Sequence, residues 1–348
     1  MDIKDYFVNE ECTVIDAMEA LDKVAKKVLF LCDGLKLIAA ITDGDIRRWI
    51  LRKGDLYAKI KEVANFNPKF LYEEKKEKAI EYMKKHSIEA IPICDHQMNI
   101  LSVVRWNDDA TELKKYLDVP VVVMAGGLGT RLYPYTKILP KPLIPIGEIP
   151  IAEHILNRFY MNGCHDFYLV INHKKNMIKA YFNEIIKKYD LTYIEEEEPL
   201  GTGGGLSLLK GKIESTFILS NCDIIILEDY SKIYKYHIKE KNKITMVCSL
   251  KKFKIPYGVV EIGENGMIES MKEKPELSFF TNTGMYIVDA SIIEELDDHQ
   301  FIGFPDIIQR YKELGEKIGV YPISENSWLD MGQLDEMEEM KRRLEFDV

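Results

Sequence analysis

Three glycines and an arginine follow an apolar stretch at residues 121–125. The segment runs Gly126-Gly127-Leu128-Gly129-Thr130-Arg131. Glycines placed directly after a buried strand let backbone amides approach phosphate oxygens closely. Arg131 lies two residues beyond the last of these glycines, so its guanidinium can reach the same phosphates. The glycines alone are equally consistent with a tight turn, whereas the arginine favours a phosphate-binding loop.

Two further charged residues stand where chemistry is expected. Lys141 lies between Pro140 and Pro142, which hold the backbone around it extended. A surface lysine is usually only solvated, but a lysine fixed in this way after a glycine-rich loop favours a phosphate contact. Asp223 follows the apolar stretch 216–220. An aspartate there can cap a helix, although the end of a fully apolar strand favours a ligand role.

These residues belong to a region of alternating strands and helices, predicted to form a domain over residues 118–348. The predicted strands cover residues 121–125, 167–172, 191–194 and 216–220, and the predicted helices cover residues 151–162, 176–189 and 202–209. This order is typical of an α/β domain with a doubly wound, mostly parallel, Rossmann-like sheet. Ligands bind such sheets beyond the carboxyl ends of the strands, where the glycines and Asp223 lie.

Residues 1–117 contain an internal repeat and are predicted to form an α+β domain. The copies cover about residues 1–62 and 63–117, and each combines two short apolar strands with a turn that ends in an aspartate and opens a helix. In the first copy an amphipathic helix precedes the strands, with Val14, Ala17, Leu21 and Val24 on one face. Units of about 60 residues bury little core alone, so we expect the copies to pack together. A polar helix over residues 107–118 would lead into the second domain.

Composition excludes several classes of protein. The net charge is −10, so a global electrostatic footprint for nucleic acid is absent. No stretch approaches the ~20 apolar residues of a membrane helix, and the first residues are acidic where a secretory signal needs basic ones. Six cysteines are scattered without a CxxC pair, which indicates reduced thiols in a cytoplasmic protein and no zinc site.

The first domain resembles a tandem pair of CBS domains, also called a Bateman module. The signature is an apolar strand followed by Thr-x-x-Asp, here Thr42 to Asp45. In that family the threonine and aspartate hold the ribose of an adenine nucleotide, so the resemblance implies an adenine nucleotide effector bound by Thr42, Asp45 and Asp108. The second copy departs from the pattern, because Arg105 stands where threonine is expected. A purely structural module that forms homo-oligomers is an equally good interpretation.

The second domain resembles the nucleotidyltransferases that join a sugar 1-phosphate to a nucleoside triphosphate (NTP). The family signature is G-G-x-G-T-R-L followed by P-K-P, and both are present. Further motifs match in order at residues 198–204, 221–223, 257–260, 273–275, 282–286 and 328–332. The last of these, Trp328-Leu329-Asp330-Met331-Gly332, resembles the motif that supplies a second metal-binding carboxylate. The match covers nearly the whole domain.

The resemblance implies three groups of site residues. The catalytic residues would be Arg131, Lys141, Asp223 and Asp330, with Mg²⁺ held by the two aspartates. The nucleotide would contact Ala125, Gly126, Gly127, Gly129, Thr130, Glu196 and Gly201, and the sugar phosphate would contact Gly258, Glu273, Lys274, Asn282 and Thr283. The sugar 1-phosphate would attack the α-phosphorus of the NTP, giving a nucleoside diphosphate sugar and pyrophosphate.

The choice of base depends on an acidic run, Glu195 to Glu198. Guanine offers two adjacent donors that one carboxylate can accept, so Glu196 predicts GTP, unless the run is only a solvated loop. The joined domains resemble guanylyltransferases that make GDP-glucosamine-type precursors of bacterial legionaminic acid glycans, and mannose-1-phosphate guanylyltransferases are similar. The alternatives are a uridylyl- or thymidylyltransferase and, in another class, a non-catalytic nucleotide sensor.

Overall fold

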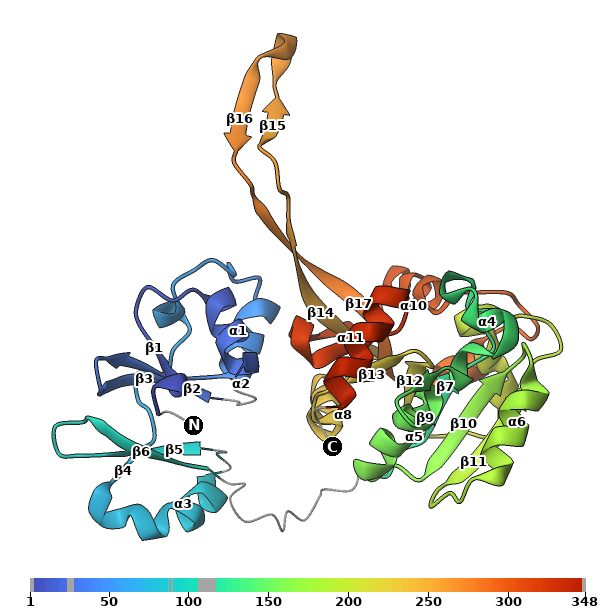
Figure 1. Cartoon of the computed structure of the whole chain (residues 1–348), viewed down its shortest axis with the longest axis horizontal. Coiled ribbons are helices and arrows are strands. Elements are labelled where there is room, and N and C mark those ends of the chain that lie inside the picture. Colours follow the sequence, from blue (N-terminus) through green and yellow to red (C-terminus); the bar gives the residue numbers. More distant parts are fainter. Residues whose placement is uncertain (1–2, 24–27, 87, 89, 106–116, 346–348) are drawn as a thin grey trace. The chain divides into compact units, whose positions relative to one another are not determined.

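The protein divides into two compact units, Met1–Leu113 and Lys114–Val348. The computed structural model describes residues 3–23, 28–86, 88, 90–105 and 117–345 (Figure 1). The predicted boundary between residues 117 and 118 lies a few residues from this division. Most of the polar helix predicted for residues 107–118 falls outside the described residues, as does Val24.

The first unit contains the same arrangement of strands twice. One sheet has the order β1 (Phe7–Val8), β2 (Val28–Asp33), β3 (Lys36–Thr42), and the other has the order β4 (Leu71–Tyr72), β5 (Ala90–Cys94), β6 (Ile100–Arg105). In each, the first strand is parallel to the second and the second is antiparallel to the third. The helices are α1 (Val14–Lys23), α2 (Asp43–Leu51) and α3 (Ala79–His86), with short 3₁₀ helices η1 (Ile3–Tyr6), η2 (Ile60–Glu62) and η3 (Glu73–Lys78). The internal repeat of the sequence is therefore also a repeat of the fold.

The two repeats of this unit share a core. Val14, Ala17 and Leu21 of α1 are buried against the first sheet, as the helical spacing predicts. A second cluster joins Phe30 of the first repeat to Ile100 of the second. Backbone hydrogen bonds also connect the copies, since the amide of Ile100 donates to the carbonyl of Leu35 at 2.8 Å. Each small repeat thus completes its core against the other.

The second unit is built on a seven-stranded sheet. Its order is β11 (Asp190–Glu195), β10 (Asp166–Ile171), β7 (Val121–Met124), β12 (Phe217–Asn221), β17 (Glu276–Val288), β14 (Ile244–Lys254), β18 (Ile318–Ile323). Only β17 runs against its neighbours, so the predicted mostly parallel sheet is confirmed. β17 is antiparallel because a hairpin joins it to β14, whereas helical crossovers separate the parallel strands.

Helices cover both faces of this sheet. Val121 and Val123 of β7 pack with α5 (Ile151–Met161), and the alternate residues Val122 and Met124 pack with α10 (Phe304–Glu313). Residues of α6 (Lys175–Glu184), α8 (Tyr230–Glu240) and α11 (Leu334–Glu345) join the first cluster, and residues of η7 (Gly205–Leu209) and α9 (Ser291–Glu295) join the second. This alternation is what a parallel sheet buried on both faces requires.

Some predicted helices differ from the structure. The helix predicted for residues 202–209 is a four-residue α-helix, α7 (Gly201–Gly204), followed by η7. Glycine is a poor helix former, and four of the five residues from Gly201 to Gly205 are glycines, so a long regular helix does not form there. The helix predicted for residues 176–189 ends at Glu184 in α6. In the part of the chain that the structure describes, no helix has the length and apolar character needed to cross a membrane.

Short elements complete the unit. They are η5 (Thr130–Leu132), α4 (Tyr135–Ile138), η6 (Lys141–Leu143), η8 (Glu264–Gly266) and η9 (Glu325–Ser327), with the strand pairs β8 (Pro145–Ile146) and β9 (Ile149–Pro150), β13 (Ile224–Ile226) and β19 (Trp328–Asp330), and β15 (Val259–Ile262) and β16 (Ile268–Lys272). Beyond the sheet, β14 and β17 stay paired as far as Lys254 and Glu276, and β15 and β16 extend this pairing. We call residues 250–281 the ribbon; Figure 1 shows it projecting from the sheet.

Candidate active site

The glycine-rich loop follows β7 and packs against the segment that carries Lys141. Gly129 has φ +65°, and a Cβ there would lie 2.8 Å from the Thr136 methyl carbon and 3.1 Å from Cβ of Lys141. The Thr136 hydroxyl donates to the carbonyl of Gly129 at 2.8 Å. Only glycine satisfies both the backbone angle and the close approach. The loop and Lys141 are therefore held together, while Thr130 and Arg131 remain exposed.

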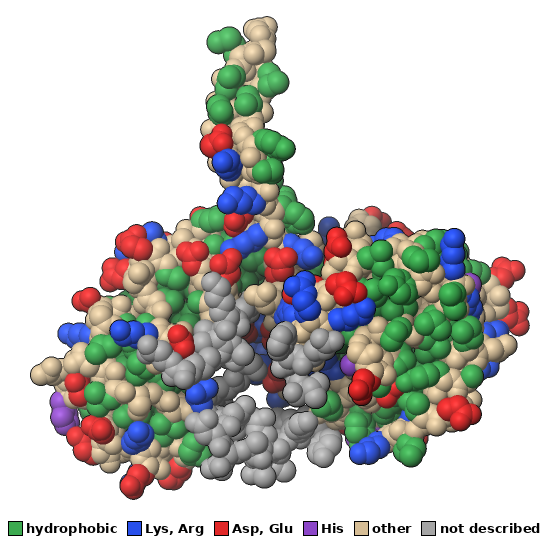
Figure 2. Space-filling model, in the orientation of Figure 1, with side chains coloured by type: hydrophobic (Ala, Val, Ile, Leu, Met, Phe, Trp, Pro, Cys, Tyr) green, Lys and Arg blue, Asp and Glu red, His purple; other side chains and the backbone are tan. Residues whose placement is uncertain are grey.

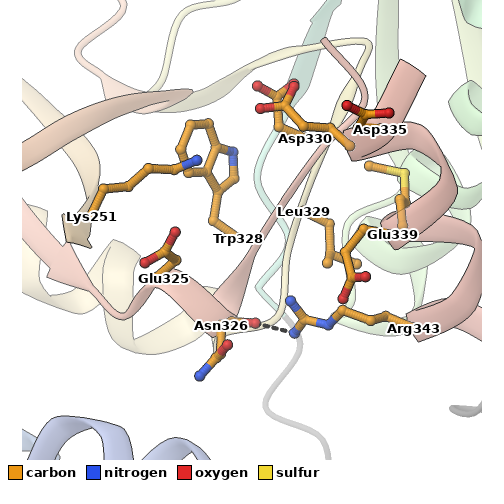
Figure 3. Close-up of a pocket in the computed structure, with 11 residues that line it drawn as sticks. Lys251, Glu325, Asn326, Trp328, Leu329, Asp330, Asp335, Glu339 and Arg343 are labelled. Carbon is orange, nitrogen blue, oxygen red and sulfur yellow. Dashed lines mark hydrogen bonds between the residues drawn. The ribbon is translucent and has the colours of Figure 1, made fainter. Parts of the chain in front are cut away.

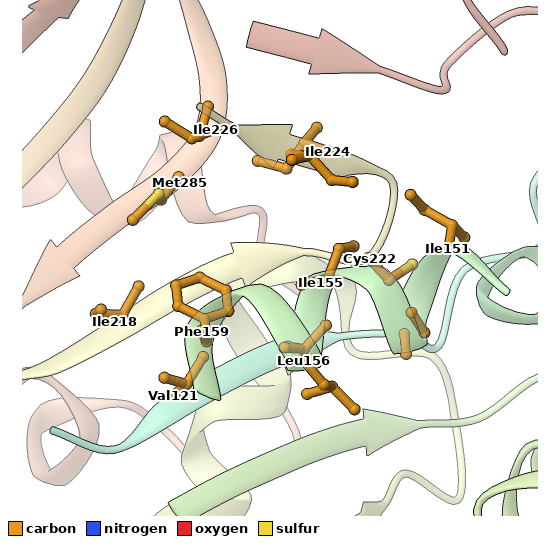
Figure 4. Packing of buried hydrophobic residues seen from close by; sticks show 14 of the residues in the cluster. Val121, Ile151, Ile155, Leu156, Phe159, Ile218, Cys222, Ile224, Ile226 and Met285 are labelled. Atoms are coloured by element: carbon orange, nitrogen blue, oxygen red, sulfur yellow. The ribbon is translucent and has the colours of Figure 1, made fainter. Parts of the chain in front are cut away.

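Two short strands bring the predicted metal-binding aspartates together. β13 pairs with β19 so that Ile224, the neighbour of Asp223, lies opposite Asp330. The amide of Met331 donates to the carbonyl of Asp223 at 2.8 Å. Cys222 and Ile224 on either side of Asp223 are buried in the core around α5 (Figure 4). The backbone at Asp223 is thus anchored on both sides, next to Asp330.

Charges of both signs meet at this pair. The Lys141 ammonium donates a hydrogen bond to the Asp223 carboxylate, and both side chains are largely buried. Burial, and then the nearby Asp223 and Glu336 carboxylates, raise the pKa of Asp330 to about 6, while Lys141 and Arg131 oppose this shift. Asp223, Glu336, Lys141 and Arg131 are therefore all within electrostatic reach of Asp330.

Glu336 was not predicted from the sequence. A Cβ on Gly332 would lie 3.2 Å from both Asp330 carboxylate oxygens and 3.3 Å from Oε2 of Glu336, so the two carboxylates share one small space. Glu336 lies in the first turn of α11, among other acidic residues. Nothing in the spacing distinguishes it from Glu338 or Glu339, and only the fold brings it to Asp330.

The two aspartates offer oxygen ligands of the kind that hard divalent cations bind. Among the described residues, no group of three or more His, Cys, Asp or Glu side chains is arranged to hold a metal alone. Mg²⁺ typically binds through one or two carboxylates, with the remaining positions filled by water and phosphate oxygens. Asp223 and Asp330, whose negative charge is only partly compensated, match that requirement.

Glu196 occupies a separate, buried position between two glycines. A Cβ on Gly126 would lie 2.7 Å from its Oε2, and a Cβ on Gly205 would lie 2.5 Å from its Oε1. Only 5% of the residue is exposed, and Oε1 has no hydrogen-bond partner among the described residues. Burial raises its pKa to about 7, although a backbone hydrogen bond from Leu200 opposes this. The neighbouring Glu195 is exposed and pairs with Lys175 at 3.0 Å, so the acidic run does not form one uniform solvated loop.

The other predicted base-side residue, Gly201, is in close contact with the chain itself. It has φ +80°, and a Cβ there would lie 2.6 Å from the carbonyl oxygen of Ile302. That carbonyl accepts hydrogen bonds from the amides of Gly203 and Gly204 at 3.0 and 3.1 Å. The glycines of this segment therefore allow α7 to pack against the chain that precedes α10.

The predicted sugar-side residues fall into two groups. Asn282 and Thr283 lie on β17 at the sheet, where the Thr283 hydroxyl donates to the carbonyl of Val247 at 2.8 Å and the Asn282 amide donates to the Tyr286 hydroxyl at 2.6 Å. Next to them Gly284, with φ +87°, leaves room for the side chain of Asn221, to which a Cβ would come within 2.4 Å. This group is therefore close to the end of β12 that leads to Asp223.

The second group, Gly258, Glu273 and Lys274, lies on the ribbon. A Cβ on Gly258 would lie 2.9 Å from Oε2 of Glu273, and the amide of Lys274 donates to the carbonyl of Tyr257 at 3.2 Å. All three residues are exposed. They lie beyond Glu276, the first residue of β17. Along β17, Glu276 is nine residues from Met285, which pairs with β12. At about 3.4 Å per residue this is ~30 Å along the strand.

A pocket of about 370 Å³ opens beside Asp330 (Figure 3). It lies between β14, β19 and α11, and its lining includes Lys251, Trp328, Asp335, Glu339 and Arg343. The Lys251 ammonium lies 4.7 Å from the centroid of the Trp328 ring. The pocket thus borders the carboxylate pair on the side where the sheet continues into the ribbon.

A comparison with protein families accounts for this arrangement. The family model described as nucleotidyl transferase matches residues 120–346. The chain belongs to the nucleotidyl transferase family. The α/β unit with its glycine-rich loop, Lys141 and the two aspartates is the part that the match covers.

Several curated proteins resemble this nucleotidyl transferase. The bifunctional protein GlmU of Methanococcus maripaludis is 32% identical over 61% of this chain and 51% of its own length. The mannose-1-phosphate guanylyltransferase catalytic subunit beta of Drosophila melanogaster is 29% identical over 61% of this chain and 59% of its own length. The chain therefore spans about half to three-fifths of the length of these relatives.

Solved structures show the same fold. HddC from Yersinia pseudotuberculosis matches with a TM-score of 0.53 and 24% identity, over 65% of this chain and 99% of that one. HddC complexed with GMP-PN matches with a TM-score of 0.52 and 23% identity over the same shares. The nucleotide-diphospho-sugar transferase fold expected for this nucleotidyl transferase is confirmed.

The predicted effector residues of the first unit are engaged with each other. Thr42 caps α2: its hydroxyl accepts from the amide of Asp45 at 3.2 Å and donates to the Asp45 carboxylate at 2.6 Å. The same carboxylate pairs with Arg48. This capping box accounts for both residues locally. Asp108, the third predicted ligand, lies outside the described residues.

Proposed function

We propose that this nucleotidyl transferase moves a nucleoside monophosphate from an NTP to a hexose or hexosamine 1-phosphate and releases pyrophosphate. The observation that supports this best is the meeting of Lys141, Asp223 and Asp330 beside a glycine-rich loop. These are the groups that phosphoryl chemistry requires: amide donors, cations and carboxylates for a divalent ion. Similar proteins include mannose-1-phosphate guanylyltransferases.

Each group has a role in this proposal. The loop amides and Arg131 bind the triphosphate, and Arg131 stabilises the charge that develops on the pyrophosphate as it leaves. Lys141, which pairs with Asp223, is available to a phosphate oxygen when that pair opens. Asp223 and Asp330 would hold Mg²⁺, which when bound neutralises charge on the phosphate oxygens.

The reaction needs no general base. The attacking oxygen of a sugar 1-phosphate is already ionised near neutral pH, so the main obstacle is the mutual repulsion of two polyanions. Cations and a fixed geometry remove that obstacle by positioning and electrostatic stabilisation. We therefore assign the protein's contribution to orientation of the two phosphates and not to proton transfer.

The proposed NTP is GTP. Glu196 offers a buried carboxylate with an unpaired oxygen beside the glycine-rich loop. Guanine carries two adjacent N–H donors on one edge, and a carboxylate accepts both. Uracil and thymine present carbonyl oxygens on either side of their single N–H, so a carboxylate at that position disfavours them. A buried acceptor left without a donor is costly, which makes Glu196 a specificity determinant.

A matrix of NTPs against sugar 1-phosphates, with pyrophosphate release as the measurement, tests the proposal. The purified full chain is expected to release pyrophosphate fastest with GTP and only when a sugar 1-phosphate is present. Preference for UTP or dTTP would instead support the alternative assignment, a uridylyl- or thymidylyltransferase. Nucleotide-induced thermal stabilisation without pyrophosphate from any pair would instead support a nucleotide sensor.

For the first unit we propose a tandem CBS module that senses an adenine nucleotide through Thr42, Asp45 and Asp108. The repeated topology of its two sheets supports this assignment. Ligand binding would require the capping box at Thr42 to share its carboxylate with ribose hydroxyls. A change in the rate of pyrophosphate release on adding AMP or ATP, without competition against GTP, is the expected result. Unchanged kinetics together with no measurable binding would leave a scaffold.

A further inference from the structure

The short helix α4 connects the two cations that the proposed function assigns to the phosphates. Arg131 lies in η5, just before α4, and Lys141 begins η6, just after it. Tyr135 and Ile138 of α4 are 47% and 75% exposed, and only Thr136 is buried. Figure 2 shows apolar side chains at the surface in the area where Figure 1 labels α4. Packing therefore contributes little to holding this element in place.

The sequence removes hydrogen-bond donors from the end of α4. In an α-helix, the carbonyl of one residue accepts a hydrogen bond from the amide four residues later. The residues four positions after Thr136 and Ile138 are Pro140 and Pro142, which have no amide hydrogen. The prolines that fix the backbone around Lys141 thus deprive two carbonyls of their usual donors. Such carbonyls need a donor from elsewhere in the chain.

Lys174 supplies these donors. Its ammonium group donates to the carbonyls of Thr136 at 3.0 Å, Lys137 at 2.7 Å and Ile138 at 3.0 Å. An ammonium group has three N–H donors, so these three hydrogen bonds use all of them. A positive charge is also favourable beside the negative ends of converging carbonyl dipoles. Lys174 therefore replaces, from a different part of the chain, what the prolines take away.

The turn that carries Lys174 is itself anchored beside the glycine-rich loop. Lys174 lies between β10 and α6 with φ +53°, an angle that residues with a Cβ rarely adopt and that persists only where contacts hold it. The Asn172 side-chain amide donates to the carbonyl of Glu196 at 3.2 Å. The amide of His173 donates to the carbonyl of Gly126 at 3.5 Å. One turn thus contacts both the glycine-rich loop and α4.

We propose that Lys174 is a positioning residue for phosphate transfer, which holds α4 and thereby fixes Arg131 and Lys141 relative to the glycine-rich loop. The inference rests on the proposed function. Lys174 acts through α4 and not on the substrate, because its three donors are occupied by carbonyls. The Thr136 hydroxyl, which donates to the carbonyl of Gly129, is the second anchor of the same element. Since a misplacement of about 1 Å can lower a rate ~100-fold, loss of one anchor should be visible in turnover.

Lys174→Met tests the proposal, because it keeps the length of the side chain and removes its donors. We expect kcat for pyrophosphate release to fall ~10- to 100-fold, with the KM for GTP and for the sugar 1-phosphate within about threefold of wild type. Lys175→Met is the matched control: Lys175 is the next residue and pairs with Glu195 at 3.0 Å, so its loss should change kcat by less than about twofold.

Three kinetic results overturn the proposal. They are a kcat for Lys174→Met within about twofold of wild type, an equal loss of kcat in Lys175→Met, and a raised KM for either substrate at unchanged kcat. The last result would mean that Lys174 contacts the substrate directly.

Lys174→Gly separates positioning from stability and serves if Lys174→Met does not fold. Glycine adopts φ +53° readily, so this variant loses the ammonium group together with the backbone cost of the left-handed conformation. Its thermal unfolding temperature should fall less than that of Lys174→Met, while its kcat falls by the same ~10- to 100-fold. A folded Lys174→Gly with the kcat of wild type would show a purely structural lysine and overturn the proposal.

Hydrogen exchange measures the order of α4 without turnover. The amide of Leu139 donates to the carbonyl of Tyr135 at 3.0 Å at the end of α4. Its exchange should be at least ~10-fold faster in Lys174→Met and unchanged in Lys175→Met. Unchanged exchange in Lys174→Met overturns the proposal. Failure of the wild-type protein to release pyrophosphate from any substrate pair would contradict the proposed function instead, and exchange would still show whether Lys174 holds α4.

Discussion

The nucleotide side and the sugar side of the candidate site are built in different ways. On the nucleotide side, Asp223 lies between buried neighbours and pairs with Lys141, and Gly129 fits tightly against the segment that holds that lysine. On the sugar side, Glu273 and Lys274 are exposed on a two-stranded ribbon. Packing thus fixes the position of the first group, whereas the second group lies on an exposed ribbon with few packing contacts of its own. Substitutions on the two sides should therefore have different consequences.

The largest effect is expected at the carboxylate pair. Asp223→Asn removes the negative charge needed to hold a divalent cation while keeping the size of the side chain. Pyrophosphate release should fall by ~10³-fold or more, with the thermal unfolding temperature nearly unchanged. Asp298→Asn is the control, because Asp298 forms an exposed ion pair with Lys210 and should leave the rate within about twofold. Near wild-type turnover in Asp223→Asn would remove the metal role.

On the ribbon, the expected loss is smaller and falls on one substrate. Lys274→Ala should raise the KM for the sugar 1-phosphate or lower kcat by ~100-fold, because a charge-assisted phosphate contact is lost. The affinity for GTP, measured by calorimetry, should stay unchanged, since the nucleotide side does not include the ribbon. Lys254→Ala, also exposed on the ribbon, is the matched control. A loss of GTP affinity in Lys274→Ala would contradict the division between the two sides.

The pH dependence of folding stability tests the environment of Glu196 on the nucleotide side. Burial raises its pKa to about 7, so its charged form is penalised in the folded protein. Below about pH 4.5 the carboxyl group is protonated in both folded and unfolded chains; the folding penalty grows as pH rises toward 7 and is constant above. Glu196→Gln should therefore stabilise the protein without GTP at pH 8 and have little effect at pH 4.5.

The same substitution should weaken GTP recognition. Guanine donors require the carboxylate, so GTP affinity of the wild-type protein should decrease as pH falls below about 7, and Glu196→Gln should lower it by ~10- to 100-fold at pH 8. Urea unfolding and GTP titrations at both pH values provide the measurements. Equal GTP affinity of wild type and variant at pH 8 would exclude Glu196 from base recognition.

The smallest effect is expected from the loop glycine. Gly129→Ala places a methyl group 2.8 Å from Thr136 on a backbone with φ +65°, so we expect a destabilisation of ~1–3 kcal/mol and a roughly tenfold lower rate from a displaced loop. Gly211→Ala is matched in φ, at +68°, but has no atom within 4 Å of the added carbon. It should show the backbone cost without the loss of rate. Equal activity of both variants would exclude the close approach as the constraint at Gly129.

The sequence predicts the strand–helix order of the second unit well because each buried strand is a distinct apolar run. It also predicts the repeat of the first unit, whose copies share turn and strand spacing. The meeting of Asp223 and Asp330 came only from a family resemblance, since β13 and β19 have three residues each and leave no periodic signal. Glu336 was missed because α11 carries several similar acids.

The position of the ribbon relative to its sheet could not be predicted from sequence patterns. Residues 257–260 and 273–275 resemble sugar-side motifs, but a hairpin has the same local pattern whether it lies on its own sheet or extends from it. That choice depends on contacts between residues distant in sequence. Glu196 was predicted from its residue type, while its isolation from Glu195 follows from the surrounding glycines, which a linear pattern does not reveal.

Pyrophosphate release by the wild-type chain, measured with GTP and a panel of sugar 1-phosphates as Mg²⁺ is titrated, tests the central claim most directly. The account predicts release that requires all three components, returns when Mg²⁺ is restored after chelation, and disappears in both Asp223→Asn and Asp330→Asn. Release that persists without a divalent cation, or in either aspartate variant, would contradict it.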